Sequence, residues 1–239
     1  MKSKIEYHNT FLSNHDFLKK NFKGKKSKYN INLFNFLKKV NKIKFPKNEF
    51  SLKESKRHKI AEMATNPIIL NFYKFLLNSF NPKRILEIGS FIGYSTLYFA
   101  KYSSKNARIT TIEKFSEFSN ICLYNFKRNK LNKKINLINQ DASLALDKLI
   151  KKKKKYDFVF LDGDKGKYKE LFMKVEKLIS KKSIVIVDNV FFQGDLINKN
   201  PLTVKGKGVK KFINYVINSK KFSVNILPMY DGIALIKKN

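Results

Sequence analysis

Acidic residues follow short apolar runs at two points in the second half of the 239-residue chain. Asp162 comes directly after the run at 157–161, and Asp188 and Asn189 come after the run at 183–187. If both runs are parallel strands, these side chains emerge at one edge of a sheet. Two carboxylates and an amide oxygen there form a half-shell that suits Mg²⁺. The alternative is that these acids cap helices or neutralise nearby lysines.

A turn that carries two glycines follows an earlier apolar run, 84–88, in the segment LEIGSFIGYST. Glu87 lies in the run, and Gly89 and Gly93 lie between it and a helical segment. A strand, a glycine turn and a helix N-terminus together favour a nucleotide-type ligand, because glycine lets the ligand approach the backbone. The spacing fits neither the dinucleotide fingerprint nor a P-loop. A purely structural turn is the alternative.

Two more acidic residues stand at the ends of the next apolar runs. Glu113 lies 24 residues beyond Gly89, a position from which an acid binds ribose hydroxyls in nucleotide-binding sheets. Asp141 and Ala142 follow the third run. An Asp in this position also caps a following helix, so capping is a serious alternative for Asp141.

The chain between these acids alternates short apolar runs with amphipathic segments, which is typical of a parallel sheet covered by helices on both faces. The predicted strands are 84–88, 108–112, 135–138, 157–161 and 183–187. The predicted helices lie near 93–103, 115–130, 142–150, 166–180 and 207–219. Two final strands, 222–227 and 233–237, are joined by the turn Met229–Gly232 and predict an antiparallel hairpin.

The N-terminal quarter differs from the rest, because residues 1–30 are polar and have no clear period. Apolar residues at helical spacing predict a helix over 31–43, ended by Phe45-Pro46. Ser51 is expected to cap a second helix to about Met63, with Glu54 in the capping box. A third helix is expected from Asn66-Pro67 to Phe80. We therefore divide the chain into a Lys-rich helical extension, 1–60, and a main domain, 61–239.

The composition is strongly basic, with 51 Lys and Arg against 18 Asp and Glu, a net charge of +33. Such a field attracts nucleic acid and other polyanions. Most of the basic residues are lysines, however, which a genome poor in G and C also favours. The single cysteine, Cys122, excludes a disulfide framework and a cysteine-based metal site. We read no membrane span and no secretory signal, and expect a cytoplasmic protein.

The stretch from Lys83 to Lys237, about two-thirds of the chain, resembles the metal-dependent group of class I S-adenosylmethionine-dependent O-methyltransferases. That group includes the catechol and caffeoyl-CoA enzymes. The matching segments are LEIGSFIGYST, ITTIEK, QDA, VFLDGDKGKY, IVIVDNVFFQG and LPMYDGIALIKK. The resemblance implies a Rossmann-like α/β fold. Its seven-stranded sheet would have the order 3-2-1-4-5-7-6, with strand 7 antiparallel.

The resemblance also implies roles for residues that bind S-adenosylmethionine. Gly89 and Gly93 would lie against its methionine part above Glu87, and Ser95 would help to bind its carboxylate. Glu113 would hold the ribose, and Asp141 and Ala142 would border the adenine. The segment Glu62–Thr65 (EMAT) is similar to a lip over the cofactor in plant relatives, which places Thr65 at the cofactor.

The chemistry that the resemblance implies is transfer of an activated methyl group to a hydroxyl oxygen. Asp162, Asp188 and Asn189 match the ligands of Mg²⁺ or another divalent cation, which lowers the pKa of a bound hydroxyl. Lys165 matches the general base of the catechol-type enzymes. The alternative for Lys165 is an ordinary surface lysine. Asp164 would orient either Lys165 or the cofactor amine.

Two segments turn the predicted acceptor toward tRNA. KGKY at 165–168 and NVFF at 189–192 are similar to the bacterial branch that methylates 5-hydroxyuridine in tRNA. Phe191, Phe192 or Tyr230 would stack on an extruded base, unless they are ordinary core residues. The alternatives are a methyltransferase of catechols or other phenols, and a non-catalytic RNA-binding protein, against which the retained metal and base residues argue. By the same resemblance, residues 1–60 would cover the active site and help to form a homodimer.

Overall fold

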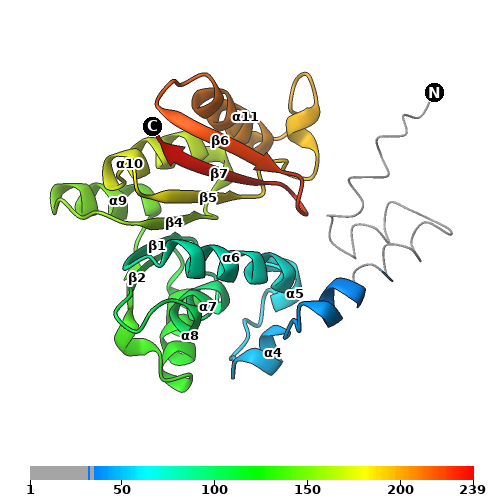
Figure 1. The fold of residues 1–239 in the computed structure, drawn as a ribbon, viewed down its shortest axis with the longest axis vertical. Coiled ribbons are helices and arrows are strands. Elements are labelled where there is room, and N and C mark those ends of the chain that lie inside the picture. Colours follow the sequence, from blue (N-terminus) through cyan, green and yellow to red (C-terminus); the bar gives the residue numbers. More distant parts are fainter. Residues whose placement is uncertain (1–31, 33–34) are drawn as a thin grey trace.

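The protein is described by a computed structural model that covers residue 32 and residues 35–239. A seven-stranded sheet forms its centre (Figure 1). The strands are β1 (Arg84–Ile88), β2 (Arg108–Glu113), β3 (Ile135–Asn139), β4 (Phe158–Leu161), β5 (Ile184–Asp188), β6 (Phe222–Leu227) and β7 (Ile233–Lys238). Their order is 3-2-1-4-5-7-6, and β7 runs antiparallel to both β5 and β6. The predicted fold is confirmed.

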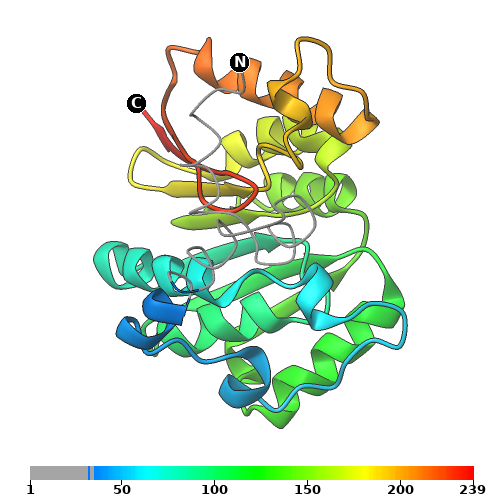
Figure 2. The same cartoon turned by 90° about the vertical axis from the view of Figure 1, so that its right-hand side faces the viewer.

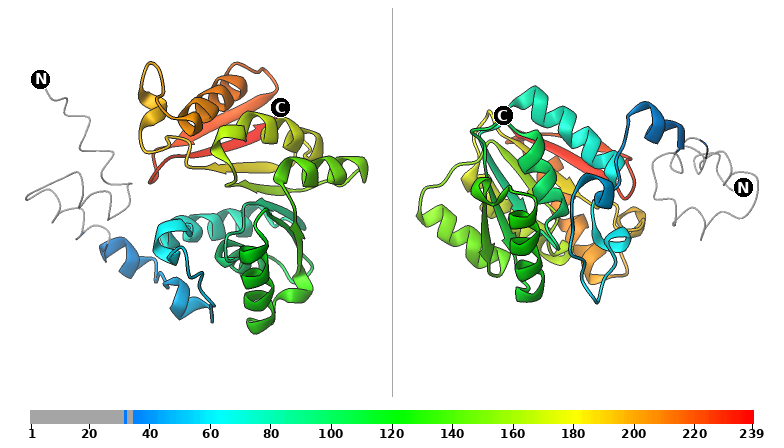
Figure 3. Two further views of the ribbon diagram at one scale, coloured as in Figure 1. Left: turned by 180° about the vertical axis from the view of Figure 1, so that it is seen from behind. Right: turned by 90° about the horizontal axis from the view of Figure 1, so that it is seen from below.

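Helices cover both faces of the sheet, as Figures 1 and 3 show from three directions. One face carries α6 (Pro67–Phe80), α7 (Tyr94–Tyr102) and α8 (Ser116–Arg128), and the other carries α9 (Ala142–Lys151), α10 (Tyr168–Leu178) and α11 (Val204–Ile217). Alternate strand residues supply the two cores: Ile85 and Phe158 pack toward α6–α8, and Leu86 and Val159 toward α9–α11. Both faces of the sheet are buried by helices, which explains why the strand sequences are continuous apolar runs.

Two helix starts follow directly from local sequence. Asn66 accepts a hydrogen bond from the Ile68 N–H at 2.9 Å, and Pro67 occupies the first helical position of α6. Thr203 caps α11 in the same way, accepting from the Gly206 N–H at 2.9 Å. The first helix was predicted with these bounds. The second begins three residues before the predicted start, because Thr203 provides the cap.

The predicted helix from Ser51 to Met63 is wrong. Only α5 (Ile60–Met63) is helical, and residues 51–59 contain neither helix nor strand. The backbone groups of Ser51 and Lys53 bond instead to asparagine side chains of α8. A partner distant in sequence therefore outcompetes the local capping signal.

The described residues before position 51 are only partly helical. Residues 35–40 are helical and the chain turns at 41–42, in agreement with the predicted helix over 31–43, of which residues 31, 33 and 34 lie outside the described residues. A short helix, α4 (Pro46–Glu49), begins at the proline that was expected only to end a helix. Residues 1–30 also lie outside the description, and the division at residue 60 stays a prediction.

We found no membrane-spanning candidate among the helices of residues 35–239, since none combines enough length with enough apolar character.

Candidate active site

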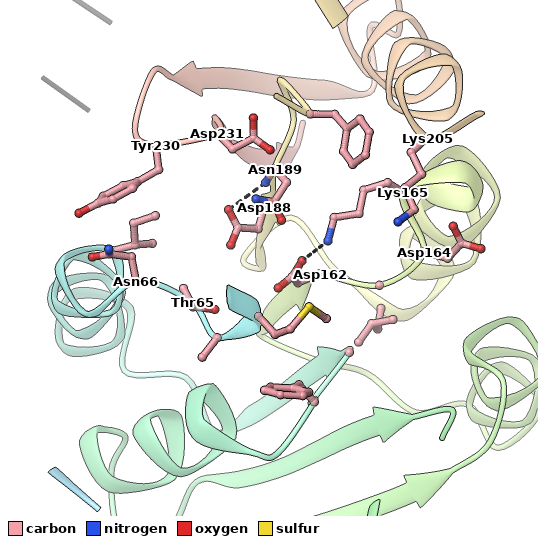
Figure 4. A pocket seen from close by; sticks show the side chains of 18 of the residues that line it. Thr65, Asn66, Asp162, Asp164, Lys165, Asp188, Asn189, Lys205, Tyr230 and Asp231 are labelled. Carbon is pink, nitrogen blue, oxygen red and sulfur yellow. Dashed lines mark hydrogen bonds and ion pairs between the residues drawn. The ribbon is translucent and has the colours of Figure 1, made fainter. Parts of the chain in front are cut away.

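A cavity of about 1810 Å³ opens at the carboxyl ends of the parallel strands. Pockets for one small ligand usually measure ~300–1,000 Å³, so this space accommodates a cofactor and an acceptor together. Most of the residues that the sequence singled out line it: Thr65, Gly89, Glu113, Asp141, Ala142, Asp162, Lys165, Asp188 and Asn189. Figure 4 shows five of them, Thr65, Asp162, Lys165, Asp188 and Asn189, together with Asp164, around the cavity. Parallel strands thus bring these acids together, as the sequence predicted.

Gly89 allows the turn after β1 to pass close to the strand that carries Asp162. Its φ of +96° lies in the left-handed region, and a Cβ here would lie 2.3 Å from the carbonyl oxygen of Asp162. The Asp162 N–H donates to the carbonyl of Ile88 at 2.9 Å, which extends the β1–β4 pairing by one residue. The glycine is therefore required by contact between two segments of the site.

Asp188 is 4% exposed at the tip of β5. Burial, together with the negative charge of Asp162, raises the pKa of Asp188 to about 7. Its Oδ1 accepts the backbone N–H of Asn189 at 2.8 Å, and Lys165 offsets part of its charge. The carboxylates of Asp162 and Asp188 therefore repel one another, and a positive charge nearby stabilises both in their ionised forms.

Lys165 donates from Nζ to Oδ1 of Asp162 at 2.5 Å (Figure 4). Burial alone would lower the pKa of this lysine, but the nearby carboxylates, Asp162 first among them, outweigh burial and raise it. Lys165 therefore holds its proton in this structure. The general-base role that the resemblance implies requires that this carboxylate charge first be balanced by something else.

Helix α11 fixes the backbone of Lys165 through a glycine that the sequence analysis did not single out. A Cβ at Gly208 would lie 2.5 Å from the carbonyl oxygen of Lys165. The helix therefore packs directly on the short 3₁₀ turn Lys165–Lys167, which Asp164 caps by accepting the Gly166 N–H at 3.0 Å. This assigns Asp164 a capping role rather than contact with Lys165.

Asp231 is the site residue that sequence reasoning missed, although it lies in the quoted MYDG turn. Its Oδ1 accepts the Gln193 N–H at 2.5 Å and its carbonyl accepts the Phe191 N–H at 2.8 Å. Burial raises the pKa of Asp231, opposed by hydrogen bonds from Gln193 and Asn189. The hairpin turn thus clamps the loop after β5, where Asn189 has a φ of 54°. Strain of this kind persists only when neighbours hold it.

Glu113 and Asp141 are already engaged by backbone groups. The two carboxylate oxygens of Glu113 each accept an N–H at 2.9 Å, from Phe91 and from Phe115. Asp141 caps α9 by accepting the Ser143 N–H at 2.9 Å, as its alternative interpretation proposed. Both still line the cavity. Their contacts with ribose and adenine stay predictions.

Three predicted cofactor residues, Glu87, Gly93 and Ser95, are not part of the cavity lining: Gly93 is the second glycine of the turn, and Glu87 and Ser95 are buried beneath it. Glu87 is fully buried and accepts from the hydroxyls of Ser95 at 2.5 Å, Thr111 at 2.6 Å and Thr96. Burial raises the pKa of Glu87 to about 7, opposed by these hydroxyls. In this structure the three residues support the turn, and their cofactor contacts stay predictions.

The oxygen atoms at the strand tips fit a hard divalent cation. No three His, Cys, Asp or Glu side chains among the described residues gather as a metal centre. The candidate here has two carboxylates, Asp162 and Asp188, and the amide oxygen of Asn189. Carboxylate and amide oxygens suit Mg²⁺, which usually keeps several water ligands. Burial first, and then the negative charge of Asp162, raise the pKa of Asp188, and a cation would balance that charge.

Charge is distributed unevenly between the cavity and the rest of the chain. Among the residues that the structure describes, seven of the 16 acidic residues line the cavity, but only six of the 43 basic ones. The acids are Glu54, Glu113, Asp141, Asp162, Asp164, Asp188 and Asp231, and the lysines are Lys47, Lys59, Lys114, Lys165, Lys167 and Lys205. The excess positive charge therefore lies outside the cavity.

A model of the O-methyltransferase family matches residues 47–239. The chain belongs to this family. This O-methyltransferase is 30% identical over 193 residues to probable caffeoyl-CoA O-methyltransferase 2 of Dictyostelium discoideum, over 80% of this chain and 82% of the relative. It is 28% identical over 170 residues to catechol O-methyltransferase of Niastella koreensis, and the match covers 69% of this chain and 77% of the relative.

Among solved structures, the fold is similar to an O-methyltransferase from Bacillus cereus in complex with SAH. The TM-score is 0.71 at 22% identity, over 94% of this chain and 96% of that one. The similarity extends over nearly the whole chain and supports the fold described above.

Proposed function

We propose that this S-adenosylmethionine-dependent O-methyltransferase methylates a hydroxyl that has a second oxygen beside it on a planar ring, and that its acceptor is 5-hydroxyuridine in tRNA. The observation that carries the proposal is the acid-lined cavity at the sheet edge of a chain whose net charge is +33. The inside suits a cation and the outside suits a polyanion.

Asp162, Asp188 and Asn189 are the residues that would hold a divalent cation such as Mg²⁺. Bound there, the cation would supply Lewis acidity, which lowers the pKa of an acceptor hydroxyl. The adjacent oxygens of 5-hydroxyuracil and of a catechol make both rings suitable for such a site. Each of the three residues lines the cavity.

The chain's own residues bind, orient and manage a proton. Methyl transfer breaks the carbon–sulfur bond of the cofactor and forms a carbon–oxygen bond, while the hydroxyl proton leaves. Such a displacement needs in-line orientation, which the glycine turn at Gly89 and the lip at Thr65 would provide from two sides. Lys165, whose Nζ lies 2.5 Å from Oδ1 of Asp162, is the residue that would take the proton once the carboxylate charge beside it is balanced.

Aromatic side chains at the cavity support a flat acceptor. Phe191, Phe192 and Tyr230 line it and are only partly buried, so each ring keeps some accessible surface. Stacking on such rings is how proteins hold a base that has left its helix. The lysine-rich exterior would bind the phosphates around that base, with an affinity that falls as salt rises.

A catechol or another phenolic small molecule is the second candidate. It is favoured by the names of the relatives, which are caffeoyl-CoA and catechol O-methyltransferases. In that case the net charge of +33 reflects composition alone. The chemistry at Asp162, Asp188 and Lys165 would be the same for both acceptors, so only the substrate itself distinguishes them.

The test is methyl transfer from labelled S-adenosylmethionine in the presence of Mg²⁺. One set of reactions contains tRNA bearing unmethylated 5-hydroxyuridine, and a second contains catechols and caffeoyl-CoA. We expect label in tRNA, lost on addition of EDTA and in Asp188→Ala. Label that enters only the phenols would overturn the tRNA acceptor and leave the O-methyltransferase assignment standing.

A further inference from the structure

Residues 51–65, which we call the strap, run antiparallel along α8 (Figure 2). Contacts occur in reverse order along the two segments: Ser51 bonds to Asn129, Lys53 to Asn125, and Arg57 pairs with Glu117 at 3.4 Å. The strap then reaches the cavity, which Ile60, Met63, Ala64 and Thr65 line. It therefore joins a surface helix to the binding site.

Asn125 of α8 and Asn129, the residue at the C-terminal cap of α8, hold the strap through its backbone. Asn125 accepts the Lys53 N–H at 2.7 Å and donates to the Lys53 carbonyl at 3.1 Å. Asn129 accepts the Ser51 N–H at 3.0 Å and donates to the Ser51 carbonyl at 2.9 Å. Each side-chain amide offers one acceptor and a donor group, so it pairs with both backbone groups of one residue. The two asparagine side chains thus make the backbone hydrogen bonds that a neighbouring strand would make in a sheet.

The spacing of the two segments explains why this pairing works. Two residues of extended chain advance about 6.8 Å, and four residues of α-helix advance about 6 Å. Asparagines at i and i+4 on a helix therefore match alternate residues of an extended segment. Leu52, between the two paired residues, points the other way and packs against the core.

The same amide also bonds to the glycine turn. Asn125 is fully buried, and its Nδ2 donates to the carbonyl of Ile92 at 2.9 Å as well as to the strap. A small separate apolar cluster reinforces this junction: Ile60 of the strap packs with Ile92 of the turn and Ile121 of α8. Strap, glycine turn and α8 therefore form one connected unit on the cofactor side of the cavity.

We propose that Asn125 and Asn129 are positioning residues that hold the strap closed over the bound cofactor, so that detachment of the strap from α8 limits cofactor release. The inference rests on the proposed binding of S-adenosylmethionine in this cavity. Ile60, Met63, Ala64 and Thr65 of the strap form part of the cavity wall, and the asparagine bonds oppose movement of that wall away from α8. Loss of one pair of bonds lowers the barrier to release.

The test measures the dissociation rate of S-adenosylhomocysteine from the full-length protein by stopped-flow displacement, together with hydrogen exchange of residues 51–65. Asn129→Ala removes one pair of strap bonds. Ser51→Pro removes the N–H of that pair from the strap side, and Phe50, with φ −139° and ψ 150°, tolerates a following proline. Asn120→Ala, on the exposed surface of the same helix, is the matched control.

We expect both variants to release S-adenosylhomocysteine about 5- to 30-fold faster than the wild type, since two hydrogen bonds are lost or weakened. Exchange in residues 51–65 should rise in parallel, and Asn120→Ala should match the wild type in both. Because Asn129 is only half-buried, its variant is expected to fold even if variants of Asn125 do not.

Unchanged release in Asn129→Ala and Ser51→Pro, with faster exchange in the strap, would overturn the inference. A lower melting temperature with unchanged release would also overturn it, by showing that the bonds serve folding alone. If the wild type itself does not bind S-adenosylhomocysteine, the proposed function fails and the inference fails with it. Binding by the wild type, with identical rates in all variants, contradicts only the inference.

Discussion

The carboxylate rim at the tips of β4 and β5 differs from the strap in what holds its backbone. Asp188 lies within β5 and pairs with Ile233 of β7, and Asp162, one residue beyond β4, donates its N–H to the carbonyl of Ile88 in β1. Ser51 and Lys53 depend on the side chains of Asn129 and Asn125. A sheet opens only with the fold, whereas a segment held by two side chains opens at a lower cost in free energy. The rigid carboxylate rim therefore lies beside a strap that can move more easily.

The largest effect is expected at the rim, with Asp188→Asn. The substitution keeps the shape of the side chain and removes the charge that would hold a divalent cation and balance Lys165. Methyl transfer should fall by about 1,000-fold or more, measured as initial rate with saturating cofactor. The control is Asp147→Asn, which changes an exposed carboxylate of α9 that pairs with Lys174 of α10 and should retain activity. Comparable rates in both variants would contradict a catalytic role for Asp188.

A smaller loss is expected where the hairpin turn supports the rim, in Asp231→Ala. Removing this side chain frees the Gln193 N–H and releases the strained Asn189. Supporting groups of this kind typically contribute about 10- to 100-fold to metal affinity or activity. Mn²⁺ affinity, measured by electron paramagnetic resonance, should weaken to that extent. Asp231→Asn keeps an acceptor oxygen and should recover part of the loss; a variant equal to the alanine form would show that charge alone matters.

The buried Glu87 predicts a dependence of stability on pH. Its pKa in the folded protein is about 7, above the usual value of 4.5, so the folded state keeps a proton that the unfolded state loses. Stability from this residue is therefore complete below pH 4.5 and is lost as the pH rises to 7. The free energy of unfolding should fall by about 1 kcal/mol per pH unit in this window, measured with urea. Glu87→Gln should lack this slope, and an equal slope in the variant would contradict the assignment.

The smallest effect is expected at the exposed end of the strap. Arg57 and Glu117 form an ion pair at 3.4 Å with side chains 77% and 40% exposed. Exposed pairs contribute about 0–1 kcal/mol, so Arg57→Ala should change stability by less than about 0.5 kcal/mol and leave strap exchange unaltered. Exchange in Arg57→Ala as fast as in Asn129→Ala would show that charge, rather than the asparagine pairs, holds the strap.

Most of the rim was predictable because its signal is local and repeated. Five apolar runs predicted five parallel strands, and the ends of three of them brought Glu113, Asp162 and Asp188 to one cavity. Asp231 was not predicted as a site residue, because an acidic residue in a turn is common and does not by itself indicate a functional site. Its role appears only when the hairpin lies against the loop at 189–193.

The strap could not be predicted, since its signal is misleading when considered alone. Ser51 followed by Glu54 is a good capping box, yet residues 51–59 form no helix. Asn125 and Asn129 are 72 or more residues away along the chain, and nothing in residues 51–59 identifies them as partners. A local preference worth about 1 kcal/mol is easily exceeded by four specific hydrogen bonds.

The sequence by itself determined the sheet, the order of its strands by resemblance, and the set of acidic residues at its edge. These follow from hydrophobic period and strand polarity, which act over a few residues. Only the tertiary structure decided that Lys165 holds its proton beside Asp162, that Asp231 clamps the loop of Asn189, and that the strap lies along α8. Each of these depends on groups brought together by folding, and their charges and hydrogen bonds act only at that short distance.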